Sequence, residues 1–185
     1  MRKRKPPRIY PKLTETELAE YVYQSNGIEG YTPDKHSEGD LLFDNHVLAA
    51  RLAEDFVWLP KLLHGTLMKG VLFGQYVGEY RDVPVLVGGQ FAARPASLFY
   101  RMRDWENMVK QGPQEDEGIG AFAWRMHDHF ECIHPFIDSN GRTGRLVLNA
   151  IRLTLGLPWI TIHVGEEQEA YYRKIREYRD TSYEP

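Results

Sequence analysis

One stretch of the chain decides the expected fold and site: His134-Pro135-Phe136-Ile137-Asp138-Ser139-Asn140-Gly141-Arg142-Thr143-Gly144-Arg145. It combines a titratable base, a carboxylate suited to hard metal ions, a turn of small and amide side chains, and two arginines three residues apart. The residues that follow have a helical hydrophobic period, so the turn opens a helix. Backbone N–H groups at a helix start attract anions, and two arginines on one side of the first turns can clamp phosphate oxygens. The stretch therefore predicts a phosphate site.

The stretch resembles the signature of the Fic family, whose pattern is H-P-F-x-D/E-G-N-G-R-x-x-R. Eleven of the twelve positions fit, and the exception is Ser139, where the pattern has glycine. The resemblance implies a mainly α Fic fold, a single-domain helical bundle with a short β-hairpin flap. It also implies an activity: transfer of AMP from ATP, with Mg²⁺, to a Ser, Thr or Tyr hydroxyl of a target protein.

The resemblance assigns a role to each polar position of the motif. His134 would be the catalytic base that accepts the proton of the target hydroxyl. Asp138 would bind Mg²⁺, since one carboxylate suffices when phosphate oxygens complete the coordination. Without the motif, a structural histidine and a loop-capping aspartate would be the simpler interpretations. The remaining positions would bind the phosphates of ATP: Ser139, Asn140, Gly141, Arg142, Gly144 and Arg145.

Ser139 leaves alternatives open. Glycine at this position permits close phosphate approach and unusual backbone angles, which serine restricts. Fic proteins with alanine there include phosphocholine transferases and a kinase-like toxin. One alternative is another phosphate transfer, either phosphorylation or deAMPylation. The other is a non-catalytic, nucleotide-binding regulatory module.

An upstream segment, Ser25-Asn26-Gly27-Ile28-Glu29-Gly30, resembles the Fic inhibitory pattern S/T-x-x-x-E-G/N. The resemblance implies that Glu29 pairs with Arg145, so that the arginine cannot receive the γ-phosphate and basal activity is low. Because this pattern precedes the motif, the chain is similar to the subgroup with an N-terminal inhibitory helix. We therefore expect a basic flexible tail over 1–12, an inhibitory helix over 13–30 and the Fic domain over 31–185.

The segment Val83–Phe91 contains branched residues and a Gly-Gly pair, which predict a short β-hairpin. It resembles the Fic flap, and we expect Val85, Leu86 and Val87 to dock an extended segment of the target by strand addition. An ordinary surface hairpin is the simpler alternative.

Hydrophobic periodicity predicts helices over most of the rest, with a capping box formed by Thr14 and Glu17 at the first start. Pro60 is expected to interrupt the helical pattern. The expected helices run from Thr14 to about Ile28, from Asp44 to Trp58, from Lys61 to Leu72, from Ser97 to Lys110, from Ile119 to Ile133, through the motif helix, and from Glu166 to Arg179.

The composition of the 185 residues excludes several classes of protein. A formal net charge of −3 and a pI near 6.2 give no general attraction to nucleic acid, so no nucleic-acid partner is expected. The basic N-terminus has no apolar run behind it, so we expect neither a signal peptide nor a membrane anchor. The single cysteine, Cys132, is expected to be buried and fits a reducing, cytoplasmic location. The oligomeric state stays open.

His127 and His129 invite a metal site together with His134. One-residue spacing places the two on different faces of a helix, and no cysteine cluster joins them. We therefore expect both to be structural.

Overall fold

The first helix, α1 (Glu15–Ile28), begins at the predicted capping box in the computed structural model, which describes residues 9–31 and 39–183. The amide of Glu17 donates to Thr14 Oγ1 at 3.2 Å, and the amide of Thr14 donates to Glu17 Oε2 at 2.8 Å. Most of the expected tail, and residues 32–38 of the expected connecting loop, lie outside the described residues. The inner face of α1 is fully buried through Leu18, Tyr21 and Val22, so this helix is part of the core.

The next two helices differ from their predicted bounds. The second, α2 (Leu41–Glu54), starts three residues early because the Asp40 carboxylate caps it by accepting from the amides of Leu42 and Phe43. It also ends early, where Phe56 takes a left-handed φ of 65°. The third, α3 (Pro60–Leu67), starts at the proline that was expected to interrupt the pattern, since proline is well tolerated at the first helical position.

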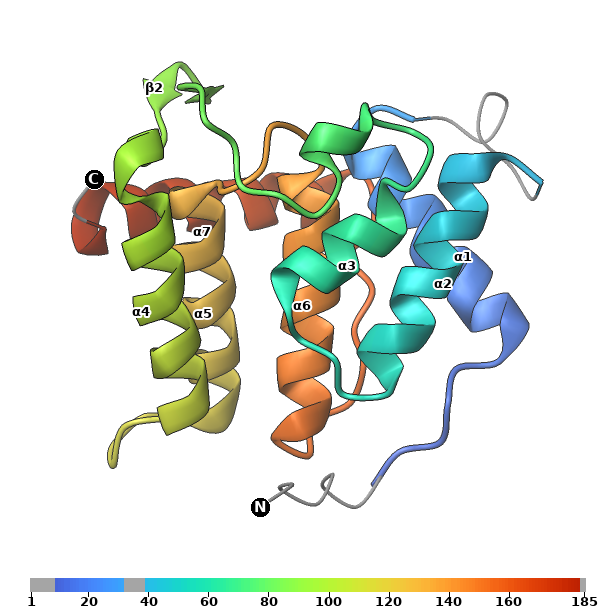
Figure 1. Cartoon of the computed structure of the whole chain (residues 1–185). Coiled ribbons are helices and arrows are strands. Elements are labelled where there is room, and N and C mark those ends of the chain that lie inside the picture. Colours follow the sequence, from blue (N-terminus) through green and yellow to red (C-terminus); the bar gives the residue numbers. More distant parts are fainter. Residues whose placement is uncertain (1–8, 32–38, 184–185) are drawn as a thin grey trace, which may run out of the picture.

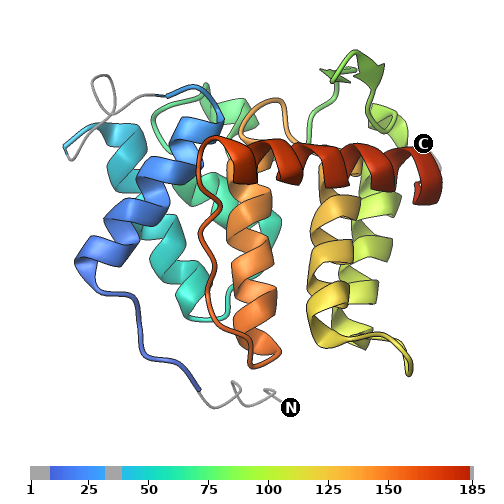
Figure 2. The same ribbon diagram turned by 180° about the vertical axis from the view of Figure 1, so that it is seen from behind.

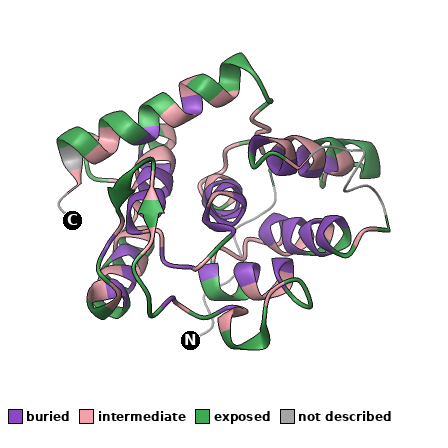
Figure 3. Cartoon of the chain, turned by 90° about the horizontal axis from the view of Figure 1, so that it is seen from above, coloured by how far each residue is buried: buried purple, intermediate pink, exposed green. Residues whose placement is uncertain are grey.

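The remaining helices include the motif helix, α6. They are α4 (Leu98–Gln111), α5 (Ile119–Ile133), α6 (Asn140–Thr154) and α7 (Glu166–Ser182). Helix α6 packs against α1, α2, α3 and α5, and in Figure 3 it lies end-on at the centre with buried residues around its circumference. Helices α4 and α5 stand side by side, and α7 crosses over one end of the bundle (Figures 1 and 2). The motif loop and the start of α6 lie at that same end.

The predicted hairpin is present but short. Strand β1 (Leu86–Val87) pairs antiparallel with β2 (Gln90–Phe91) through the turn Gly88-Gly89. Both turn glycines have positive φ, 59° and 82°, as the two central residues of a type I′ hairpin turn require. The hairpin lies above the end of α4, at the same end of the bundle as the motif loop (Figure 1), and Leu86 and Phe91 are exposed.

The prediction of a mainly α bundle with one hairpin is therefore confirmed for the described residues. None of the helices in these two ranges is long and apolar enough to cross a membrane.

Candidate functional site

Helix α5 ends where Pro135 prevents His134 from continuing it. His134 takes the left-handed conformation, φ 52° and ψ 62°, and turns the chain into the motif loop. Its Nδ1 lies 3.3 Å from the carbonyl oxygen of Glu131, which can only accept a hydrogen bond. Nδ1 therefore carries the proton, and Nε2 keeps a free lone pair.

The environment keeps the His134 ring neutral. Burial lowers the pKa of His134 to about 4. The hydrogen bond to the Glu131 carbonyl acts in the opposite direction, and the charges of Arg81 and Arg179 lower the pKa further. A neutral imidazole with a free Nε2 can accept a proton from a hydroxyl at physiological pH.

Arg81 is a residue that the sequence did not single out. Its buried guanidinium donates to the carbonyl oxygens of Ile133 and His134 on one side, and of Val83 and Ala93 on the other. Val83 and Ala93 lie on the two chain segments leading into and out of the hairpin. Arg81 therefore fixes the hairpin relative to His134. The only sequence signal was a charged residue just before the predicted hairpin.

The motif loop is closed by Asn140 and anchored by Phe136. Asn140 accepts from the Phe136 amide at 2.8 Å and donates to the Phe136 carbonyl at 2.9 Å, so its amide shapes the loop. The Phe136 ring is fully buried and stacks on His64 with centroids 3.9 Å apart.

Ser139 has φ 59°, the left-handed conformation that favours the glycine of the family pattern. Its buried hydroxyl donates to Met68 Sδ at 2.9 Å and accepts from Arg142 Nη2 at 2.6 Å. In this arrangement the Ser139 hydroxyl helps to fix the position of Arg142.

The two motif arginines are almost fully buried yet under-satisfied. Besides its bond to Ser139, the guanidinium of Arg142 contacts the Tyr31 ring, with its Cζ 4.9 Å from the ring centroid. Among the residues with described positions, Arg142 Nε and Nη1 and Arg145 Nη1 have no hydrogen-bond partner. Buried donors are rarely left unpaired, and an acceptor-rich ligand would satisfy these three atoms.

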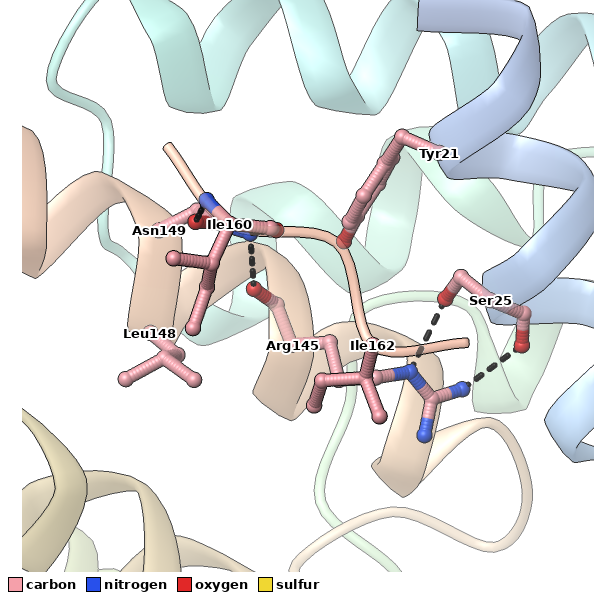
Figure 4. A pocket seen from close by; sticks show the side chains of 7 residues that line it. All are labelled: Tyr21, Ser25, Arg145, Leu148, Asn149, Ile160 and Ile162. Atoms are coloured by element: carbon pink, nitrogen blue, oxygen red, sulfur yellow. Dashed lines mark hydrogen bonds between the residues drawn. The ribbon is translucent and has the colours of Figure 1, made fainter. Parts of the chain in front are cut away.

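Arg145 is held by the end of α1. Its Nε donates to Ser25 Oγ at 2.9 Å, and its Nη2 donates to the Ser25 carbonyl and to Glu29 Oε1, both at 2.8 Å. Figure 4 shows the guanidinium directed at Ser25 across the narrow space lined by Tyr21, Asn149 and Ile160. The expected ion pair between Glu29 and Arg145 is present.

Electrostatics keep that pair charged. Burial alone would raise the pKa of Glu29, but the charge of Arg145 and its hydrogen bond bring it below the ordinary value. Burial likewise opposes the charge on Arg145, and Glu29 outweighs it, so the pKa of Arg145 is raised. Both groups are ionised at neutral pH.

Two glycines of the motif make room for carboxylates. A Cβ atom at Gly141 would overlap Glu29 Oε1 and lie 3.1 Å from Arg145 Nη1. A Cβ atom at Gly144 would overlap Glu131 Oε1. Glu29 therefore occupies the space directly over the first turn of α6, which is where the helix amides attract an anion.

Asp138 lies at the outer edge of the loop, with its side chain 53% exposed. Its carboxylate accepts from the Ser139 amide and lies 3.8 Å from Arg142 Nη2. No cluster of three or more His, Cys, Asp or Glu side chains suited to a metal occurs in 9–31 and 39–183. A single exposed carboxylate fits Mg²⁺, which commonly binds one or two carboxylates together with phosphate oxygens and water.

The two upstream histidines contact different side chains. His127 Nδ1 lies 3.0 Å from Asp128 Oδ1 and its Nε2 3.1 Å from the Tyr171 hydroxyl, whereas His129 contacts the Tyr178 hydroxyl. Cys132 is buried, and burial raises the pKa of its thiol to about 11, so it is not a reactive nucleophile.

Comparison with known proteins agrees with this geometry. The Fic/DOC family model matches residues 47–151. Relatives named protein adenylyltransferase Fic include two from Drosophila species. The one from Drosophila mojavensis is 27% identical over a match that covers 78% of this chain and 30% of the relative. The one from Drosophila willistoni is 35% identical over a match that covers 51% of this chain and 19% of the relative. The chain thus spans less than a third of the length of these curated relatives.

Solved structures show the same fold. A Fic domain containing signaling protein from Bacteroides thetaiotaomicron is 25% identical with a TM-score of 0.71, over 90% of this chain and 73% of that one. Fic-1 from C. elegans is 21% identical and has a TM-score of 0.66, and the match covers 88% of this chain and 55% of Fic-1. Because the family match extends over more than half of its length, the chain belongs to the Fic/DOC family.

Proposed function

We propose that this chain transfers AMP from ATP to a Ser, Thr or Tyr hydroxyl of a target protein, and that Glu29 inhibits it at rest. The observation that carries the proposal is the pair of buried arginines with unpaired donors beside a neutral His134. A polyphosphate would satisfy those donors. The names of the Drosophila relatives support ATP as the donor and AMP as the transferred group.

In this mechanism the target hydroxyl loses its proton to Nε2 of His134 as its oxygen attacks the α-phosphorus of ATP. The new oxygen–phosphorus bond forms as the bond to pyrophosphate breaks. The α6 amides and the two arginines hold the phosphates and stabilise the developing charge. Asp138 would hold Mg²⁺, which when bound neutralises phosphate charge.

Glu29 inhibits by occupying the phosphate position. Its carboxylate lies over Gly141 and engages Arg145 Nη2, so a γ-phosphate at the same place would lose that donor and face a like charge. ATP then binds without the alignment that in-line attack requires.

The hairpin is the proposed docking site for the target. Of Val85, Leu86 and Val87, Leu86 has the exposed apolar side chain, and Arg81 links the segment that leads into the hairpin, at Val83, to the His134 carbonyl. An extended target segment added to this edge would bring its hydroxyl to Nε2. A cytoplasmic location stays a prediction from the single cysteine.

Replacing Arg81 with lysine tests this arrangement. Lysine has one charged point and no planar fork, so it cannot hold four carbonyl oxygens at once. We expect kcat/KM for the protein target to fall by about 10- to 100-fold, as small misplacements of reacting groups do, while the Kd for ATP stays unchanged. Steady-state kinetics with labelled ATP would measure both.

Arg94→Lys is the matched control, because Arg94 is an exposed arginine close to the same hairpin. It is expected to behave like the parent protein. If kcat/KM of folded Arg81→Lys stays within twofold of the parent, the hairpin is not positioned through this residue.

Position-specific labelling tests the reaction itself. The Glu29→Gly protein is incubated with cell lysate and ATP labelled on either the α- or the γ-phosphorus. If the reaction transfers AMP, only the α-label is incorporated. Chelation of Mg²⁺ by EDTA is then expected to prevent this incorporation. Incorporation of the γ-label alone would establish phosphorylation instead, and ATP binding without either label would establish a non-catalytic module. Mass spectrometry of the labelled proteins identifies the targets.

A further inference from the structure

A second carboxylate lies behind the motif, and none of the roles above uses it. Glu131 is on the last turn of α5, three residues before His134, and is 5% exposed. Its Oε2 lies 4.0 Å from His134 Nδ1, and its Oε1 lies 3.6 Å from His127 Nε2. Within the described part of the chain, Oε1 has no hydrogen-bond partner.

The motif helix is shaped to admit this carboxylate. Gly144 faces it, and a Cβ atom there would overlap Oε1. Gly144 has ordinary helical geometry, so its backbone angles do not require glycine. A side chain at this position would displace the Glu131 carboxylate from its present place.

A purely structural role explains the carboxylate poorly. A buried carboxylate that serves packing is normally fully hydrogen-bonded, because an unpaired buried oxygen is costly. Glu131 instead leaves one oxygen unpaired and directs the other toward the ring nitrogen that carries the proton of His134.

We propose that Glu131 is a positioning residue for His134. The Glu131 carboxylate stabilises the imidazolium that forms when Nε2 of His134 accepts the target proton. The Glu131 carbonyl fixes the ring through Nδ1–H, and the carboxylate of the same residue supplies the opposing charge. This inference rests on the proposed function, since it concerns the base of that reaction. The proton itself stays on His134, and no second transfer to Glu131 is needed.

The charge on Glu131 depends on pH near neutrality. Burial raises its pKa to about 7, against the lowering effect of His127 and Arg145. The carboxylate is therefore ionised above pH 7 and loses its charge as pH falls below it. Other titratable groups around it are Asp128 and Cys132 on α5, Tyr171 and Tyr172 on α7, and Glu29 at the end of α1.

The test compares Glu131→Gln with its parent, both carrying Glu29→Gly to remove inhibition. Glutamine keeps the size and loses the charge. At pH 8 we expect kcat of the Glu131→Gln variant to be about tenfold lower than that of its parent. At pH 6 the parent has lost the same charge, so the ratio of parent kcat to variant kcat is expected to shrink toward one. The ratio cancels titrations that both proteins share, such as those of ATP. The KM for ATP is expected to stay unchanged.

Tyr178→Phe is the matched control, because it removes a hydroxyl bonded to another histidine of α5, His129, and leaves Glu131 and the groups around it intact. It is expected to keep both kcat and its pH dependence. A ratio for Glu131→Gln within twofold of one at pH 8 would overturn the proposal.

A spectroscopic measurement separates this inference from the proposed function. The infrared spectrum at pH 6 is expected to contain a protonated carboxylic acid band that Glu131→Gln removes and that fades as pH rises through 7. This band requires no catalysis, so it is read even if the Glu29→Gly protein incorporates no label. Its persistence at pH 8 would show that Glu131 stays uncharged there and would overturn the assignment of Glu131.

Discussion

Replacing Glu29 with glycine is expected to raise Mg²⁺-dependent incorporation of the α-label by about 5- to 150-fold, the range of a typical coupling free energy between two sites. The substitution removes the carboxylate that engages Arg145 and overlies Gly141. It leaves α1 in place, because the inner face of that helix is buried in the core and Ser25 still holds the guanidinium by two hydrogen bonds. Arg145 Nη2 then becomes available to the γ-phosphate.

Two controls make this result specific. Glu29→Gln keeps the shape of the side chain and loses the charge, so it should give an intermediate gain if repulsion of phosphate contributes. Glu20→Ala removes a carboxylate of the same helix that contacts only exposed groups, and it should leave the basal rate unchanged. The inhibitory role of Glu29 is refuted if Glu29→Gly stays as inactive as a variant without the base.

The site was largely predictable because its chemistry is local in sequence. His134, Asp138 and the two arginines lie within twelve residues, and proline, glycine and helical period determine how that stretch turns. The ion pair between Glu29 and Arg145 spans 116 positions, and only the resemblance to a family pattern connected its two partners. Periodicity alone gave no indication of it.

Other parts of the site depend on contacts that no local pattern encodes. Arg81 holds carbonyl oxygens that come from four separate positions, and an arginine before a hairpin has no sequence feature that announces such bonds. Glu131 resembles any polar residue of an amphipathic helix, although the glycine at 144 was a clue to a close neighbour. The predicted helix starts at Asp44 and Lys61 differ from the observed starts, after the Asp40 cap and at Pro60, because capping preferences outweighed hydrophobic period.

Replacing His134 with asparagine in the Glu29→Gly background is expected to lower kcat by about 10²- to 10⁴-fold, the usual contribution of a general base. Asparagine is chosen because His134 has a left-handed backbone, which asparagine tolerates better than alanine or other non-glycine residues. The loop is then expected to keep its shape, since its closure depends on Asn140 and Phe136. Single-turnover measurements with α-labelled ATP would give the rate of the chemical step.

Binding should separate from catalysis in this variant, because the phosphate donors come from Arg142, Arg145 and the α6 amides and none comes from His134. We expect the Kd for ATP to stay within a few-fold of the parent while the transfer rate collapses. His163→Asn, which changes an exposed histidine paired with Glu167, should affect neither quantity. A folded His134→Asn protein that transfers AMP within tenfold of the parent rate would exclude His134 as the base, because asparagine cannot accept the target proton.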